Sequence, residues 1–163
     1  MTKHICRYKY FFIAAVLAWA VIFTAIRFYN SSNILPSQDA SASFALVGGA
    51  KIFVEVATST AAIQTGLSGR TSLDADRGMI FVFPKPDKYR FWMPDMNFPV
   101  DIIWINGDKV IGITKNASNE FDSTNPVFYA SSNPARYVLE VNAGFIENRN
   151  INIGDEVVLY NIK

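Results

Sequence analysis

Residues 90–114, "RFWMPDMNFPVDIIWINGDKVIGIT", carry the clearest indications of the fold. Pro94 and Pro99 have no backbone N–H for a strand ladder, so the segment that they bound is predicted to be a loop. The apolar run that follows predicts a strand, and Asn106-Gly107-Asp108 predicts a hairpin turn because Asn-Gly tolerates positive φ. The stretch therefore predicts, in order, a strand, a proline-bounded loop and a β-hairpin.

Segments on both sides of this stretch also predict strands. Residues 78–83, "GMIFVF", are apolar on both faces, and residues 89–93 are expected to return beside them as a hairpin. Further strands are predicted at residues 51–57, 135–141 and 153–162. The number of short strands favours a mainly β domain over a βαβ fold.

One segment, "TSTAAIQTGL", has the pattern of a helix. Thr58 or Ser59 can serve as its N-cap, and Gly66 suits a left-handed stop with Leu67 folding back. The fold class expected from these elements is mainly β, a compact β-sandwich or barrel with one short helix, preceded by an N-terminal transmembrane anchor.

The expected anchor is the charge-free apolar run of residues 11–26, which follows a basic lead-in with Lys3, Arg7 and Lys9. With its aromatic flanks the run can cross a hydrocarbon core of ~30 Å at ~1.5 Å per residue. We expect residues 1–29 to form the lead-in and anchor, residues 30–43 a flexible linker, and residues 44–163 an exported domain. The positive-inside rule places the N-terminus in the cytoplasm and the domain in the periplasm or outside the cell.

A cleaved signal peptide is the alternative interpretation of the N-terminus, and it predicts a secreted protein. Ala40 and Ala42 form a small-residue pattern that a peptidase could accept. This pattern lies well beyond the apolar run, so a single-pass anchor in the inner (plasma) membrane is the favoured prediction.

Charge and reactive residues exclude several classes of function. Four of the fifteen Lys and Arg residues and one of the fourteen Asp and Glu residues precede residue 44, which leaves eleven against thirteen in the domain. A slightly acidic domain is a poor match to a phosphate backbone, so no nucleic-acid partner is expected. His4 and Cys6 lie in the lead-in, so the domain has no histidine or cysteine for nucleophilic catalysis or a zinc site. We expect no metal and no cofactor.

Carboxylate chemistry is the remaining route to an enzyme, possibly a hydrolase. The candidates for catalysis are Asp101, Glu140 and Asp95. Asp101 shares a strand face with apolar residues, so it is expected to be buried and therefore paired. Its structural alternative is to accept an arginine or the backbone N–H groups of residues 93–99 and so to fasten the proline-bounded loop.

A binding module is the favoured function, for a small ligand or an envelope protein. The predicted ligand-binding residues, which could line a groove, are Trp92, Met93, Met96, Phe98 and Asp101. The alternative for Trp92, as for Trp104, is a place in the core. Met96 and Phe98 lie in the proline-bounded loop, where apolar side chains either pack beneath it or face a partner.

Three motifs, "GLSGR…RGMIFVF", "FWMPDMNFPVDIIWI" and "ARYVLEVNAGF…IGDEV", follow one another in this order. Together they resemble the domain of unknown function 192 family, over residues from about Lys51 to Tyr160. The family pattern reads Phe-Trp-Met-Lys-Asn-Thr, and this chain departs from it at residues 94–96; the family's Gly-Leu-Met becomes Gly66-Leu67-Ser68. The resemblance implies a mainly β domain, often exported behind a signal or anchor, without an established activity.

Overall fold

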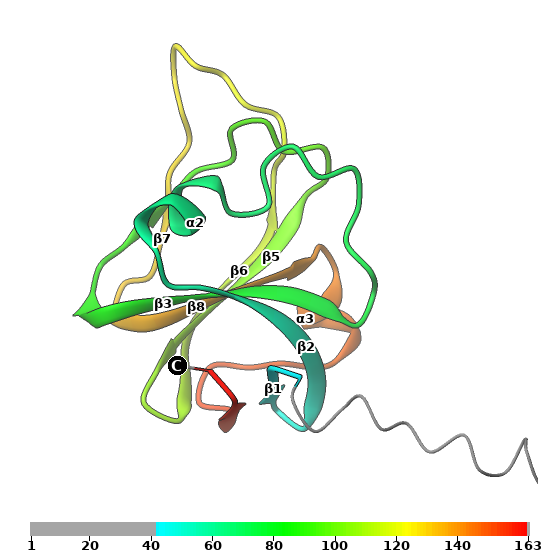
Figure 1. Cartoon of the computed structure of the whole chain (residues 1–163), viewed down its shortest axis with the longest axis vertical. Coiled ribbons are helices and arrows are strands. Elements are labelled where there is room, and N and C mark those ends of the chain that lie inside the picture. The colour runs from blue at the N-terminus through cyan, green and yellow to red at the C-terminus, as the bar shows by residue number, and fades with distance from the viewer. Residues whose placement is uncertain (1–41, 163) are drawn as a thin grey trace, which may run out of the picture. The chain divides into compact units, whose positions relative to one another are not determined.

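The computed structural model describes residues 42–162, so the predicted anchor and most of the predicted linker lie outside the described residues. Within the described part, no helix has the length and apolar character needed to cross a membrane. Figure 1 shows the chain order of the elements, which are β1 (Phe44–Val47), β2 (Ala50–Ala57), α2 (Thr60–Thr65), β3 (Arg77–Asp87), β4 (Arg90–Phe91), β5 (Val100–Asn106), β6 (Lys109–Ala117), β7 (Tyr129–Ala130), β8 (Ala135–Asn142), α3 (Phe145–Asn148) and β9 (Val157–Tyr160).

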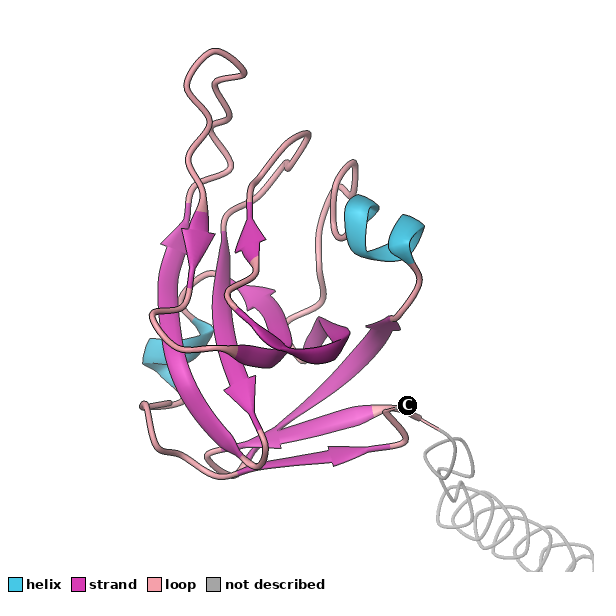
Figure 2. Ribbon diagram, turned by 90° about the vertical axis from the view of Figure 1, so that its left-hand side faces the viewer, coloured by secondary structure: helices cyan, strands magenta, loops and turns pink. Residues whose placement is uncertain are grey.

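Seven strands form one curved sheet in the order β6-β5-β8-β3-β2-β1-β9. Neighbouring strands are antiparallel except β2 and β3, which are parallel. The sheet curls into a half-barrel, visible in Figure 2. Its two edge strands, β6 and β9, are joined only near their first residues. There the Val110 N–H donates to the Asp155 carbonyl at 3.0 Å, and the Val157 N–H donates to the Asp108 carbonyl at 2.8 Å. The mainly β prediction is therefore confirmed.

Two details of the predicted fold were wrong. β3 forms no hairpin with β4, because β2 and β8 already occupy both of its edges, as suits a strand that is apolar on both faces. β4 instead pairs with β7 in a separate two-stranded sheet. The described residues also contain a second short helix, α3, and α2 forms the crossover of a local βαβ unit between β2 and β3.

The predicted helix and hairpin turn are confirmed. The Ser59 hydroxyl accepts the Ala62 N–H at 3.2 Å and caps α2, and Gly66 ends the helix with a φ of 50°. A Cβ at Gly66 would also lie only 3.3 Å from the Phe81 ring, so glycine suits both the conformation and the space there. Gly107, with a φ of 61°, turns β5 into β6.

The central strands bury side chains on both faces of the sheet, which produces two separate hydrophobic clusters. The closed cluster fills the inside of the half-barrel and is mostly aliphatic; among its buried residues are Ile52, Ile80, Ile103, Ile105, Leu139 and Val141. The open cluster on the other face is rich in aromatic residues and methionine; among its buried residues are Met79, Phe81, Phe83, Phe91, Met93, Met96 and Trp104. Side chains that alternate along one strand therefore enter different clusters.

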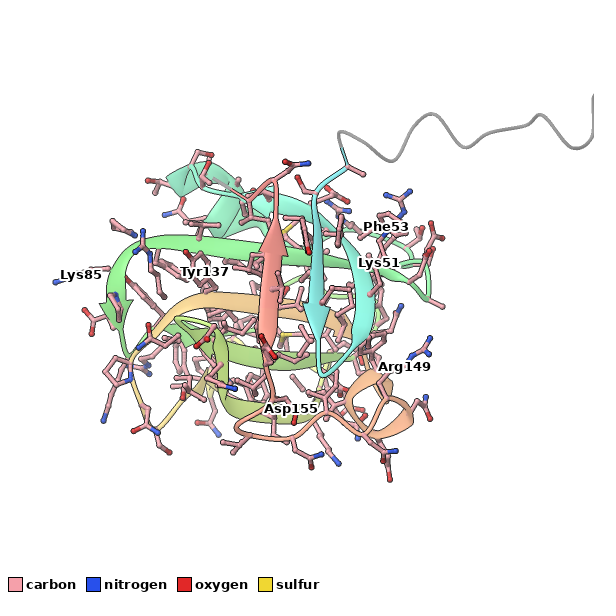
Figure 3. All side chains as sticks on the ribbon, turned by 90° about the horizontal axis from the view of Figure 1, so that it is seen from below. Lys51, Phe53, Lys85, Tyr137, Arg149 and Asp155 are labelled. Atoms are coloured by element: carbon pink, nitrogen blue, oxygen red, sulfur yellow. The ribbon has the colours of Figure 1, made fainter. Side chains whose placement is uncertain are left out.

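The outer side of β1, β2 and β9 presents a small aromatic surface, which Figure 3 views from below. Phe44 stacks on Tyr160 with ring centroids 4.3 Å apart. The Lys51 ammonium lies 4.4 Å from the Phe44 ring centroid and 4.5 Å from that of Phe53. Lys51 therefore makes cation–π contacts with both of these rings.

Candidate ligand-binding pocket

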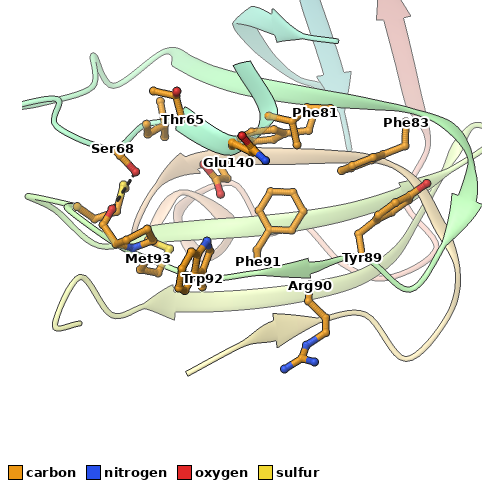
Figure 4. A pocket seen from close by; sticks show the side chains of 16 residues that line it. Thr65, Ser68, Phe81, Phe83, Tyr89, Arg90, Phe91, Trp92, Met93 and Glu140 are labelled. Carbon is orange, nitrogen blue, oxygen red and sulfur yellow. Dashed lines mark hydrogen bonds between the residues drawn. The ribbon is translucent and has the colours of Figure 1, made fainter. Parts of the chain in front are cut away.

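A pocket of ≈ 280 Å³ opens on the face of the sheet that carries the open cluster. Its floor comes from β3 and β8, one wall from the end of α2 and the segment after it, and the other from β4 and the proline-bounded loop. The lining residues are Ile63, Gln64, Thr65, Gly66, Leu67, Ser68, Phe81, Phe83, Tyr89, Arg90, Phe91, Trp92, Met93, Pro94, Met96 and Glu140. Figure 4 shows Glu140 with the rings of Phe81, Phe83, Tyr89 and Phe91 to one side and Thr65 and Ser68 to the other.

The aromatic wall is preorganised by ring contacts. Phe83 and Tyr89 stack with centroids 3.5 Å apart, and Phe81 meets Phe91 edge to face at 4.9 Å. Phe91 also contacts Trp104 edge to face at 5.6 Å, which links the wall to the open cluster beneath it. The Tyr89 hydroxyl donates to the Lys85 carbonyl at 2.8 Å. These contacts hold the four rings against one another and against the buried Trp104.

Hydrogen bonds clamp the two loops that form the rim at the other end. The Ser68 hydroxyl donates to the Pro94 carbonyl at 2.8 Å, and the Gly69 N–H donates to the Asp95 carbonyl at 2.8 Å. The Asn97 side-chain amide donates to the Arg70 carbonyl at 2.9 Å. Two of the positions at which the sequence departs from the family pattern, residues 68 and 94, therefore contact each other at this rim.

Glu140 supplies a carboxyl group to the floor of an otherwise apolar pocket. It lies on β8 beside Met79 of β3 and Ile102 of β5, and only 5% of the residue is exposed. Among the described residues its carboxyl group accepts no hydrogen bond and forms no ion pair, and its oxygens are accessible from the pocket rather than enclosed by protein atoms. Burial alone raises the pKa of Glu140 to about 8. The carboxyl group thus has access to the pocket and can exist there in either protonation state near neutral pH.

Asp101 is fully buried but lies on the opposite face of the sheet. Its Oδ1 accepts the Asn116 N–H at 2.8 Å and its Oδ2 accepts the Ile146 N–H at 2.9 Å. These bonds hold the irregular end of β6, where Asn116 has a φ of 53°, and the first turn of α3. The prediction that Asp101 accepts backbone N–H groups is confirmed, but the predicted partners were wrong: the proline-bounded loop is held by residues 68–70 instead.

The other predicted site residues divide between the pocket and its surroundings. Trp92, Met93 and Met96 line the pocket, whereas Phe98 is half-buried against the open cluster and Asp95 is exposed on the loop. Trp92 is 48% exposed and stacks on Phe128 with centroids 5.9 Å apart, so it is a rim residue; Trp104 is buried in the core. No group of three potential metal ligands occurs among the described residues.

Most of the aromatic wall was not predicted as part of a site. Phe81, Phe83, Tyr89 and Phe91 come from strands on which aromatic residues also suit an ordinary core. One local feature of the sequence did point to the pocket: residues 78–83 are apolar on both faces, so this strand must be covered on both sides. In the structure α2 covers only part of one face, and the pocket occupies the remainder. Glu140, between Leu139 and Val141, was identified as a candidate because a charge interrupts an apolar strand.

Solved structures with this fold are known. A protein of unknown function from Novosphingobium aromaticivorans DSM 12444 is 31% identical, with a TM-score of 0.64, over 72% of this chain and 83% of its own. A protein from Sinorhizobium meliloti 1021, described as a "putative transcription regulator", is 24% identical, with a TM-score of 0.66, over 77% of this chain and 100% of its own, and it supports the fold alone.

No curated protein matches this sequence. The model of the DUF192 family, described as an uncharacterized ACR, matches residues 44–159. This range covers all the described strands except the last residue of β9, and it includes the half-barrel and every residue of the pocket. The chain is therefore a member of the DUF192 family, as the three sequence motifs predicted.

Proposed function

We propose that this chain is an envelope protein whose β domain binds a small ligand in the pocket above Glu140. The observation that carries the proposal is an open, aromatic-walled pocket whose floor holds a single carboxyl group with no partner among the described residues. A mostly apolar pocket with few fixed polar groups is the usual form of a small-molecule site. A second carboxyl group, which a glycosidase-like mechanism needs, is absent from the described lining of the pocket.

The test uses 2-phenylethanol, a small neutral aromatic probe, titrated into the full chain by ligand-observed NMR. We expect weak, saturable binding that is lost in Gln64→Trp, because Gln64 lines the pocket and a bulky ring there fills it. Ala61→Trp on the same helix is the matched control, since Ala61 is exposed and does not line the pocket. Binding that is equal in both variants would place the site elsewhere and contradict the proposal.

The proposed location at the membrane rests on residues 11–26. If these residues remain attached as an anchor, the native protein fractionates with the inner membrane and has an intact mass that includes them. An N-terminus near Ser43 in the native protein would instead support a cleaved signal peptide and a secreted domain.

A second candidate function is general acid–base catalysis by Glu140. It is favoured by the pKa of about 8, which suits proton transfer near neutral pH. Incubation of the full chain with a panel of esters and glycosides, followed by NMR, distinguishes the two functions. Conversion that disappears in Glu140→Gln supports a catalyst, whereas compounds that bind and are recovered unchanged support a binding protein.

A further inference from the structure

We propose that the ligand of this pocket is an organic ammonium ion, bound with its charged group against Glu140 and its apolar substituent against the aromatic wall. This inference rests on the proposed binding function and names its ligand class. It starts from Glu140, a largely buried side chain in the floor that lines the pocket and has no hydrogen-bond or charged partner among the described residues. A buried carboxylate requires a cation or several donors to offset its lost hydration.

The cations of the described chain near the pocket do not supply that partner. Arg90 lines the pocket, but Figure 4 shows its guanidinium directed away from it. The guanidinium carbon lies 4.0 Å from the centroid of the Phe128 ring, outside the pocket. Arg70, near the rim, makes a two-bond ion pair with Glu55, in which Nη2 lies 2.7 Å from Oε2. The space in the pocket next to the Glu140 carboxyl group is therefore available for the cationic group of a ligand.

The walls match an ammonium ion better than other charged groups. The rings of Phe81, Phe83 and Phe91 present aromatic faces and edges, and aromatic faces attract cations most strongly where water is excluded. An anion would find no positively charged group directed into the described pocket. A hard metal ion requires several oxygen ligands, and the pocket offers one carboxyl group. A volume of ≈ 280 Å³ limits the ligand to a small molecule.

Proton linkage gives the inference a second readout. Burial holds the pKa of Glu140 at about 8, so near neutral pH the free pocket is mainly protonated and an ammonium ligand must displace that proton. The other titratable groups of the described lining are Tyr89, whose pKa is raised by desolvation and by the nearby Asp87, and Arg90, whose guanidinium is directed away from the pocket. The neighbours of Glu140 on β3 and β5, Met79 and Ile102, are apolar. Affinity for the ammonium ion should therefore rise up to about tenfold per pH unit from pH 6 to 8.

The experiment compares three probes of one shape by isothermal titration calorimetry of the full chain. They are 2-phenylethylammonium, 2-phenylethanol and phenylacetate, which are positive, neutral and negative. We expect the ammonium ion to bind at least tenfold more tightly than the alcohol, with proton release below pH 8, and the carboxylate to bind most weakly. Equal binding of ammonium ion and alcohol, or tighter binding of phenylacetate, would overturn the inference and leave the binding function standing. Failure of all three probes to bind would overturn both.

Glu140→Gln isolates the charge, because the amide has the shape of the protonated carboxyl group. We expect it to remove the preference for the ammonium ion and the pH dependence, and urea denaturation checks that the variant is folded. Glu147→Gln, an exposed position on α3 that does not line the pocket, is the control and should bind like the parent. A preference for the ammonium ion that survives in Glu140→Gln would contradict the proposal.

Discussion

Asp101 and Glu140 are two buried carboxyl residues on neighbouring strands of one sheet, and their surroundings differ in kind. Both Asp101 oxygens accept backbone N–H groups, whereas the Glu140 carboxyl group meets no donor among the described residues and opens to a pocket. The residue opposite Asp101 is Val141, and the residue opposite Glu140 is Ile102, so the two acids leave opposite faces of the sheet. A shift of one residue in β8 would move Glu140 to the closed face, and the same shift in β5 would move Asp101 to the open face.

The two faces also pack differently. In the closed cluster, branched aliphatic side chains interlock inside the half-barrel, and the carboxylate at its edge ties β6 and α3 to the sheet. In the open cluster, large rings stack on one another, and the short helix α2 and the loops cover them incompletely, which leaves the pocket. We infer that the closed face contributes mostly to stability, whereas the incomplete packing of the open face leaves space for a ligand.

The largest expected effect is on the closed face. Asp101→Ala removes the acceptor of two N–H groups, those of Asn116 and Ile146, and should lower the free energy of unfolding by about 3–6 kcal/mol, since each bond to a charged group contributes about 1.5–3 kcal/mol. Urea denaturation of the full chain measures the change. Asp108→Ala, at an exposed turn position, is the control and should change stability by no more than about 0.5 kcal/mol. Equal midpoints for the two variants would show that Asp101 is not a structural fastener.

The next effect is a pH dependence that comes from the open face. Because the folded pKa of Glu140 is about 8 and the ordinary value of a glutamate is 4.5, Glu140 holds up to one more proton in the folded state than in the unfolded state between these values. Stability must then fall as pH rises, by roughly 2–3 kcal/mol between pH 5 and 7 at 1.36 kcal/mol per pH unit.

Glu140→Gln cannot titrate and should lack this loss, so the difference between its stability and that of the parent should widen toward pH 7. Urea denaturation at several pH values measures the difference, with Glu147→Gln expected to follow the parent. If the parent and Glu140→Gln give parallel curves, Glu140 is not desolvated and the contrast between the two acids disappears.

The smallest effect concerns the rim of the pocket. Ser68→Ala removes the hydrogen bond from the Ser68 hydroxyl to the Pro94 carbonyl and should cost about 1 kcal/mol. Ser72→Ala, at an exposed position nearby, should be neutral within about 0.5 kcal/mol. Thermal melting compares the two variants, and 2-phenylethanol should bind more weakly to Ser68→Ala because the rim loses one of its clamps. Unchanged melting and binding would show that the loops are held by the remaining bonds alone.

Part of the pocket was predictable because it is local in the chain. Trp92, Met93 and Met96 lie in or directly before the segment bounded by Pro94 and Pro99. The prolines indicate a loop, and its apolar side chains must either pack against the domain or contact a partner. Met96 packs beneath the loop and is 8% exposed, one of the two alternatives expected for it. The aromatic wall was not predictable in this way, because Phe81 and Phe83 reach the pocket only through the pairing of β3 with β8.

The amino-acid sequence by itself determined the family, the mainly β class, the capped helix, the hairpin turn and the burial of Asp101. Each of these depends on short-range chemistry: missing N–H groups at proline, positive φ at glycine, side-chain alternation along a strand, or motifs read in order. Only the tertiary structure decided that β3 lies between β2 and β8, that Asp101 binds Asn116 and Ile146, and that Glu140 faces an aromatic pocket. The physical reason is that strand alternation specifies two faces but not what covers each of them, which depends on the register and order of strands distant in the chain.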